Sequence, residues 1–194
     1  MKSLDLNKIG KLYFGYEDIA RIRGISPASA KVTASRYVQN GLLLRFKRNM
    51  YMLRHVWDTA SQSDKFRISN LIQSPSYISL ATALDFFEIS TQIQQNYFES
   101  IAPRRTKTIQ VVGTTFTYTK MNLDLYFGFR KENGFFIAIP EKALLDALYL
   151  MSYGRYSLDL SAIDIKSFDG NVIQSLSTKY PTKTQEKLKQ YGYL

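Results

Sequence analysis

The hydrophobic pattern of the first sixty residues predicts three short helices. Leu6 and Ile9 are spaced for one face of a first helix. A second helix is predicted over residues 16–23, with Glu17 and Asp18 in its first turn, where the helix dipole favours acidic side chains. A third helix is predicted over residues 27–40, directly before Gly41. Only residues 24–26 separate the second and third predicted helices, which therefore form a pair joined by a short turn.

The turn between these two helices has residues suited to a sharp connection. Gly24 can end a helix in the left-handed conformation, and Ile25 can fill the core beneath the turn. Ser26 is a good N-cap, and Pro27 suits the first helical position. Two helices joined by a short turn that contains glycine are typical of a helix-turn-helix.

After Gly41 the pattern changes to that of two strands. Residues 42–46 and 50–53 predict a β-hairpin whose tip is Lys47-Arg48-Asn49. The tip contains Asn but no Gly, so the turn type stays open. A hairpin that follows a helix-turn-helix predicts the wing of a winged helix-turn-helix, and we assign residues 1–57 to this domain.

The rest of the chain predicts a second, α+β domain over residues 64–194. The polar residues 56–63 suggest a linker, and helices are expected at 64–72 and, after an N-cap at Ser79, at 80–87. Residues 97–139 contain five segments rich in β-branched and aromatic residues, which predict a small, mostly antiparallel sheet. These segments are 97–102, 107–112, 115–120, 125–130 and 135–139. A strongly apolar helix at 140–153 and two C-terminal helices, near 172–179 and 182–191, complete the prediction.

Composition limits the possible chemistry. Of the 194 residues, 45% are hydrophobic and 22% charged, which is typical of a folded protein. The chain has no cysteine, and this excludes disulfides, thiolate catalysis and cysteine-ligated zinc. The N-terminal residues lack an apolar signal segment, and no apolar run is long enough for a membrane span. We therefore expect a cytoplasmic protein.

Positive charge is concentrated at the N-terminus. The chain carries a formal net charge of +10, and residues 1–60 hold 11 Lys or Arg against 4 Asp or Glu. Between Asp18 and Asp58 the sequence has eight basic residues and no acidic one. A solvated basic face is the simpler interpretation of such a run. Because this run coincides with a helix-turn-helix pattern, it favours a polyanionic partner, namely double-stranded DNA.

The third helix divides into two faces. Ala30, Ala34, Tyr37 and Val38 are expected to pack on the other helices. The opposite face and the hairpin supply the candidate DNA-binding residues, since recognition helices contact bases through their N-terminal part and hairpin cations contact the backbone. The candidates are Ser26, Ser29, Lys31, Thr33, Arg36, Arg45, Lys47, Arg48 and Asn49. Arg36 can pair with guanine or with a phosphate, and the sequence leaves both open.

Candidate catalytic groups are few. His55 is the only histidine, and its position at the end of the hairpin does not suggest a catalytic triad or a metal site. Asp159, Asp164 and Asp169 recur at a spacing that does not align them on one helix face, so we interpret them as caps and loop acids. Asp146 lies in the apolar helix and needs a polar partner, for which Arg104, Arg105 and Arg130 are candidates. We expect no catalytic residue, no metal and no cofactor.

Four stretches of the chain resemble the AbiE-type (AbiEi) antitoxin family of bacterial transcriptional regulators. The first two are Tyr16-Glu17-Asp18-Ile19-Ala20 with Gly24-Ile25-Ser26, and Asn40-Gly41-Leu42-Leu43 leading to Lys47-Arg48-Asn49-Met50-Tyr51. The others are Pro75-Ser76-Tyr77-Ile78-Ser79-Leu80 followed by Ala83-Leu84, and Ile139-Pro140-Glu141-Lys142-Ala143-Leu144-Leu145-Asp146. Family members often have Arg-Gly at the wing tip, where this chain has Arg48-Asn49.

The resemblance implies the antitoxin of a toxin–antitoxin operon for antiviral defence by abortive infection. The winged helix would bind inverted repeats in its own promoter and repress it, and the second domain would counteract a nucleotidyltransferase toxin. Alternatives are an orphan regulator with the same fold, a DNA-targeted enzyme and a protein-interaction module. The lack of a metal cluster or phosphate loop argues against the enzyme, and the basic stretch argues against the interaction module.

Overall fold

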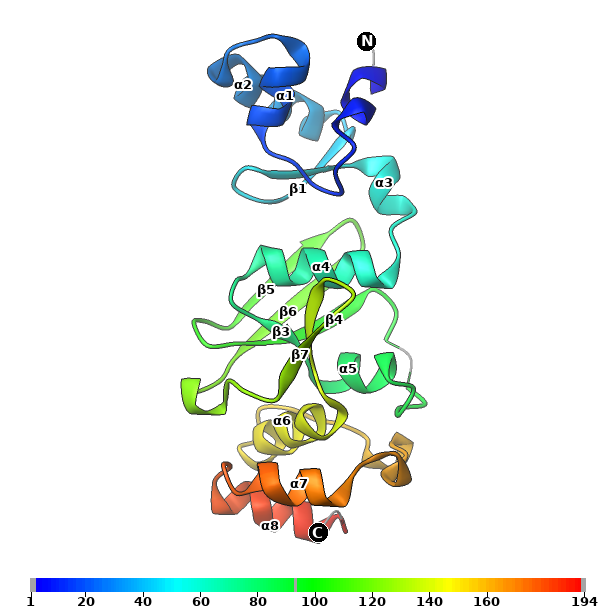
Figure 1. Cartoon of the computed structure of the whole chain (residues 1–194), viewed down its shortest axis with the longest axis vertical. Coiled ribbons are helices and arrows are strands. Elements are labelled where there is room, and N and C mark those ends of the chain that lie inside the picture. Colours follow the sequence, from blue (N-terminus) through cyan, green and yellow to red (C-terminus); the bar gives the residue numbers. More distant parts are fainter. Residues whose placement is uncertain (1–2, 93, 193–194) are drawn as a thin grey trace. The chain divides into compact units, whose positions relative to one another are not determined.

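The protein is an α+β fold, described by a computed structural model that covers residues 3–92 and 94–192. Among these residues it has eight α-helices, a two-stranded antiparallel sheet and a six-stranded mixed sheet (Figure 1). The chain divides into two compact units, Met1–Lys65 and Phe66–Leu194. None of the described helices is long and apolar enough to cross a membrane.

Unit 1 contains the predicted helix pair and hairpin. The 3-10 helix η1 (Ser3–Ile9) takes the place of the first predicted helix and is followed by α1 (Tyr16–Arg23) and α2 (Pro27–Gln39). Strands β1 (Leu43–Lys47) and β2 (Met50–Leu53) pair antiparallel, with Leu43 opposite Leu53 and Lys47 opposite Met50. Phe14 extends this small sheet, because its backbone N–H and C=O both bond to Tyr51 at 2.9 Å.

The local sequence explains the connection between α1 and α2. Gly24 ends α1 at a φ of 62°, and Ile25 N donates to Ala20 O at 3.1 Å. Ser26 then caps α2 by accepting a hydrogen bond from Ser29 N, and Pro27 takes the first helical position. The core below contains ten buried hydrophobic residues from η1, both helices and the hairpin: Leu6, Phe14, Ile19, Ala20, Ala30, Ala34, Tyr37, Leu43, Tyr51 and Leu53.

The segment predicted as a linker is partly helical. Residues 54–58 form α3 (Arg54–Asp58), and α4 (Gln62–Ile72) begins two residues before the predicted helix. The linker prediction for residues 56–63 was wrong because Trp57 is buried, with its ring 5.1 Å from that of Phe46. This contact fixes α3 against the hairpin, so the polar residues around Trp57 do not form a free connection.

Unit 2 is built on the mixed sheet, whose strand order is β5-β6-β4-β3-β8-β7. Its strands are β3 (Tyr77–Ile78), β4 (Tyr97–Ala102), β5 (Lys107–Val111), β6 (Thr114–Lys120), β7 (Phe129–Glu132) and β8 (Phe135–Ala138). β3 is parallel to β8 and β4 is parallel to β6, whereas the other three pairings are antiparallel. The sheet is therefore larger and more mixed than the small, mostly antiparallel sheet that we predicted, because β3 was missed and because β4 and β6, both predicted, pair in parallel.

Helices of unit 2 lie on both sides of this sheet (Figure 1). On one side lies α4, where Phe66 packs against the rings of Phe86, Phe98 and Phe135 at 5.1–5.7 Å. On the other lies α6 (Pro140–Ser152), which contacts α5 (Leu80–Phe86), α7 (Gly170–Ser177) and α8 (Thr182–Gln190). Nearly all residues of α6 are buried, as predicted from the apolar residues that cover most of its circumference.

Candidate nucleic-acid interface

The outer face of α2 is polar, exposed and free of acidic residues. Ala30, Ala34 and Tyr37 are buried and Val38 is partly buried, which confirms the predicted inner face. The exposed residues on α2 are Pro27, Ala28, Ser29, Lys31, Val32, Ser35, Arg36 and Gln39, with Thr33 half-buried. Because Val32 keeps 53% of its surface exposed, this face also offers an apolar contact beside its hydrogen-bonding groups.

Two of the candidate residues at the start of α2 already have local hydrogen bonds. Ser26 Oγ accepts from Ser29 N at 3.2 Å and lies 2.9 Å from Ser29 Oγ. Further along, Thr33 Oγ1 donates to Ser29 O at 2.9 Å. Ser26 and Ser29 remain exposed, but their first role is to define where the helix begins.

The hairpin presents three exposed cations. Arg45 alternates with the buried residues Leu44 and Phe46, so the strand itself directs it outward. Lys47 and Arg48 lie at the tip, where the register shifts between Arg45 and Lys47. Arg45 Nε donates to Lys47 O at 3.4 Å, which ties the Arg45 side chain to the tip. The hairpin therefore carries a cationic edge that ends at its turn.

Asn49 has a role that the sequence did not reveal. It adopts a φ of 55°, in the left-handed region where Asn is tolerated well. Its Oδ1 accepts from Tyr16 N at 2.7 Å, and its Nδ2 donates to Glu17 Oε2 at 2.8 Å. The same hydrogen bond from Asn49 lowers the pKa of Glu17. We predicted Asn49 as a DNA contact, and the structure places its side chain against the N-terminus of α1, where it holds the hairpin tip.

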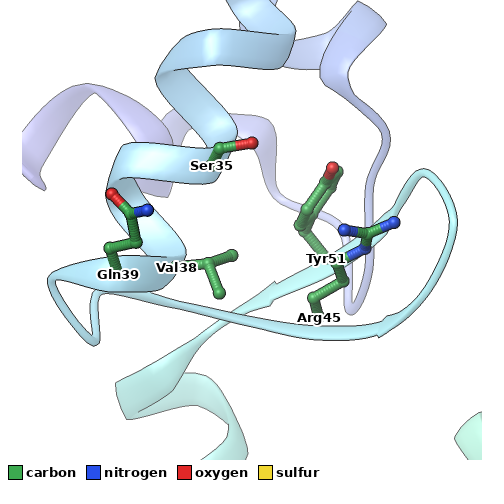
Figure 2. A pocket seen from close by; sticks show the side chains of 5 residues that line it. All are labelled: Ser35, Val38, Gln39, Arg45 and Tyr51. Carbon is green, nitrogen blue, oxygen red and sulfur yellow. The ribbon is translucent and has the colours of Figure 1, made fainter.

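A cleft separates the outer face of α2 from the hairpin. It has a volume of about 240 Å³ and is lined by Ser35, Val38 and Gln39 of α2 and by Arg45 and Tyr51 of the hairpin. Figure 2 shows the Ser35 hydroxyl pointing toward Tyr51, with the guanidinium of Arg45 beside the Tyr51 ring. The lining contains no acidic residue, so a cation and several hydrogen-bonding groups face an open space.

The basic residues of unit 1 differ in how they are neutralised. Arg21 and Lys11 both pair with Asp18, and Arg54 pairs with Asp58 at 2.8 Å. Lys31 Nζ lies 4.7 Å from the centre of the Tyr16 ring. By contrast, four arginines of unit 1 have no ion-pair partner in the part of the chain that the structure describes: Arg23, which bonds to the Tyr37 hydroxyl, and Arg36, Arg45 and Arg48. Unneutralised charge therefore lies at the end of α1, on α2 and on the hairpin.

Unit 2 contains a fully buried ionic cluster centred on Asp146. Lys142, one helical turn earlier on α6, bonds to Asp146 Oδ1, and neither side chain is exposed to solvent. Tyr77 and Ser79 donate to Asp146 Oδ2 at 3.0 and 2.8 Å, and Tyr180 donates to Oδ1 at 2.8 Å. The predicted arginine partners of Asp146 were wrong. Arg130 pairs with Glu132, whereas Arg104 and Arg105 are exposed after β4.

The geometry of this cluster points to a structural function. Lys142 Nζ lies 4.7 Å from the centre of the Phe127 ring and bonds to Tyr180 Oη at 2.6 Å, so aromatic rings and one carboxylate surround it. Burial lowers the pKa of Lys142, although the charge of Asp146 opposes this effect. Burial, together with Asp146, raises the pKa of Tyr77 and Tyr180 well above the ordinary range. The Lys142 and Asp146 side chains are thus fully enclosed by unit 2.

A second buried carboxylate belongs to Glu99 of β4 and lies next to the start of α5. Glu99 is 4% exposed, and its Oε2 accepts from Tyr156 Oη at 2.9 Å. Its backbone N–H donates to Thr82 Oγ1 at 2.9 Å, and its C=O accepts from Ser79 N. Burial raises the pKa of Glu99 to about 7, partly opposed by hydrogen bonds from Tyr156 and from the backbone of Ala81 and Thr82. Glu99 thus titrates near neutral pH in the interior of unit 2.

The remaining sequence candidates have simple structural explanations. Asp159, Asp164 and Asp169 each cap a short helix by accepting a backbone N–H bond, which confirms their interpretation as caps. His55 is exposed on α3. Among the described residues, no group of three or more His, Cys, Asp or Glu side chains is arranged to hold a metal ion.

No protein-family model matches the sequence, and no curated protein matches it either.

Proposed function

We propose that this protein binds double-stranded DNA through unit 1, which acts as a winged helix-turn-helix, and that it regulates transcription in the cytoplasm. The observation that carries the proposal is an acid-free cleft beside α2, together with arginines on α2 and the hairpin that have no ion-pair partner among the described residues. Arg45 lines the cleft from the hairpin, Arg36 is exposed on the outer face of α2, and Arg48 is exposed at the hairpin tip. A polyanion with a repeating spacing of charges would satisfy all three.

The shape of unit 1 supports α2 as the recognition helix. The B-DNA major groove, about 12 Å wide, admits one α-helix, and α2 presents Ser29, Val32 and Arg36 along one exposed line. In this position Arg36 would pair with a guanine edge or a phosphate, and Val32 would contact a thymine methyl group. Arg45, Lys47 and Arg48 would hold the backbone and contribute to affinity more than to sequence preference.

The cleft gives the DNA backbone a defined place. Ser35, Gln39 and Tyr51 offer hydroxyl and amide donors, and Arg45 offers a guanidinium next to them. A phosphate between recognition helix and wing would receive charge-assisted hydrogen bonds from this set. Asn49 supports the arrangement because it holds the hairpin tip to α1 and so fixes Lys47 and Arg48 relative to α2.

We further propose that the protein is the autoregulatory antitoxin of a toxin–antitoxin operon. This extension rests on the resemblance to AbiE-type antitoxins. Unit 1 would repress its own promoter at inverted repeats, and unit 2 would counteract a co-expressed nucleotidyltransferase toxin. In this proposal the protein is a binding protein and not an enzyme. An orphan regulator with the same DNA-binding surface is the alternative, and it would lack the second activity.

A binding titration against the DNA upstream of the protein's own gene tests the first part. With roughly five to eight phosphate contacts, the slope of log K against log salt should be about −4 to −7. Arg36→Ala should weaken specific binding by roughly 1–3 kcal/mol if Arg36 contacts a base, and Lys47→Ala should weaken binding to all sequences alike. Arg54→Ala is the matched control, because Arg54 is already paired with Asp58. Binding that is absent or independent of salt would refute the proposal.

Co-expression tests the antitoxin role separately. If a nucleotidyltransferase-like gene lies next to this one, its product alone should arrest growth, and the wild-type protein should restore it. A variant with impaired DNA binding, such as Arg36→Ala, should still restore growth, because unit 2 would carry that activity. If growth is not restored while the protein binds its upstream DNA, the protein is a regulator without an antitoxin role.

A further inference from the structure

Unit 2 contains a pocket that the DNA-binding proposal does not use. It has a volume of about 390 Å³ and is lined by residues at the end of β6 and near the C-terminal end of α6. Its lining residues are Thr106, Lys120, Met121, Asn122, Tyr149 and Arg155. The volume falls within the range of roughly 300–1,000 Å³ that is usual for small-molecule sites.

Positive charge dominates this pocket. Lys120 and Arg155 are exposed, and neither forms an ion pair with any residue that the structure describes. Arg155 Nη2 donates to Lys120 O at 3.3 Å, which holds the guanidinium at the rim and leaves its other N–H groups available. The lining contains no acid, and Asp124, which accepts from Asn122 at 3.3 Å, is not part of it.

Hydroxyl groups add neutral donors to the two cations. The Tyr149 hydroxyl has no hydrogen-bond partner among the described residues, although its ring is half-buried against Tyr153 and Tyr180. Thr106 Oγ1 accepts from Lys120 N at 2.9 Å, and its own proton remains free to donate. An anion in the pocket would therefore find charged and neutral donors together.

The C-terminal end of α6 reduces the positive electrostatic potential of Lys120 and Arg155 only weakly. The C-terminus of an α-helix carries partial negative charge on its last carbonyls. At the end of α6, Arg155 N donates to Leu150 O at 2.9 Å and Gly154 N donates to Met151 O at 3.0 Å. The C=O groups of Leu150 and Met151 therefore already accept hydrogen bonds from the backbone that follows α6. Arg155 also places a full positive charge next to them.

We propose that this pocket binds a small phosphate-bearing ligand of the mononucleotide class. Lys120 and Arg155 would hold the phosphate, with Thr106 and Tyr149 donating to its oxygens. The half-buried Tyr149 ring and the Met121 side chain would provide the apolar wall on which a base or sugar packs. This site is independent of DNA binding by unit 1, and it makes unit 2 a candidate sensor of a soluble ligand.

Isothermal titration calorimetry on the full-length protein at low salt tests this site with AMP, inorganic phosphate and adenosine. AMP should bind, and adenosine should not. Lys120→Gln and Arg155→Gln should each weaken AMP binding roughly tenfold, the usual effect of losing one charge-assisted hydrogen bond. Lys131→Gln is the matched control, because Lys131 is an exposed lysine on β7 at the opposite edge of the sheet. Both pocket side chains are exposed, so these variants should fold normally.

The outcomes separate the sources of the phosphate group. Tighter binding of AMP than of inorganic phosphate assigns a nucleotide, and equal binding assigns free phosphate; either result supports an anion site. The proposal is overturned if neither compound binds, if adenosine binds as tightly as AMP, or if both pocket variants bind as the wild type does.

Discussion

Replacing Glu99 by glutamine should change how the stability of unit 2 depends on pH. The Glu99 carboxyl lies in the interior with Tyr156 as its side-chain donor, and burial raises its pKa from 4.5 to about 7. Because the folded-state pKa lies above the unfolded one, folding favours the protonated form. The free energy of unfolding should therefore fall as the pH rises from about 4.5 to about 7. Above pH 7 the loss of stability from ionising the buried carboxyl is fully present.

The size of the effect follows from the shift. Each pKa unit corresponds to about 1.4 kcal/mol, so a rise from 4.5 to about 7 makes the buried charge cost about 3 kcal/mol at pH 8. Glutamine resembles the protonated carboxyl in shape and cannot ionise. Glu99→Gln should be close to wild type in stability at pH 4.5 and more stable by about 3 kcal/mol at pH 8.

Urea denaturation at several pH values provides the assay. Trp57 is the only tryptophan and lies in unit 1, so its fluorescence follows that unit, whereas circular dichroism also follows unit 2. Glu186→Gln, which removes an exposed carboxylate on α8, is the control and should change the pH dependence by a few tenths of a kcal/mol at most. If the stability of Glu99→Gln depends on pH between 4.5 and 8 as that of the wild type does, the raised pKa of Glu99 is refuted.

Three further substitutions test other contacts by urea denaturation. Asn49→Ala should destabilise unit 1 by about 1–2 kcal/mol, because it loses the bond to the start of α1 and strains a left-handed residue, whereas Asn49→Gly should cost less; equal costs would contradict the backbone part of the argument. Lys142→Met should destabilise unit 2 by about 3–5 kcal/mol, since it leaves Asp146 buried without a cation, and adding Asp146→Leu should recover part of that loss; strictly additive losses would refute the coupling. Ser26→Ala should cost about 1 kcal/mol through loss of the α2 cap, and no loss would mean that Pro27 alone defines the helix start.

Local signals in the sequence were sufficient to predict α1, α2 and the hairpin. Gly24, Ser26 and Pro27 each determine the backbone at one position, so the turn between the helices could be located without knowing what packs around it. The capping role of Asp159, Asp164 and Asp169 could be predicted in the same way, because each carboxylate bonds to a backbone N–H only two or three residues away. The exposed face of α2 was also predicted, because its period follows directly from the helix.

Features that depend on distant contacts were missed. β3 has only two residues, and its place between β4 and β8 is determined by partners far along the chain. The role of Asn49 depends on α1, from which it is separated by the whole of α2. Two features of the sequence could have indicated contacts that we did not predict. Trp57, the only tryptophan, argued against a free linker, and Lys142 stands four residues before Asp146, the spacing of an ion pair on one helix face.

The position of β3 also sets the order in which unit 2 can assemble during synthesis. Ile78 pairs with Ile137, and Tyr77 and Ser79 bond to Asp146, so the centre of the sheet cannot close until α6 has left the ribosome. Until then, the exposed edge of β3 and the unpaired side chains of Tyr77 and Ser79 belong to an incomplete chain that is open to aggregation. Non-local strand pairing of this kind slows folding. A truncation before residue 146 should therefore yield a folded unit 1 attached to an unfolded and rapidly degraded remainder.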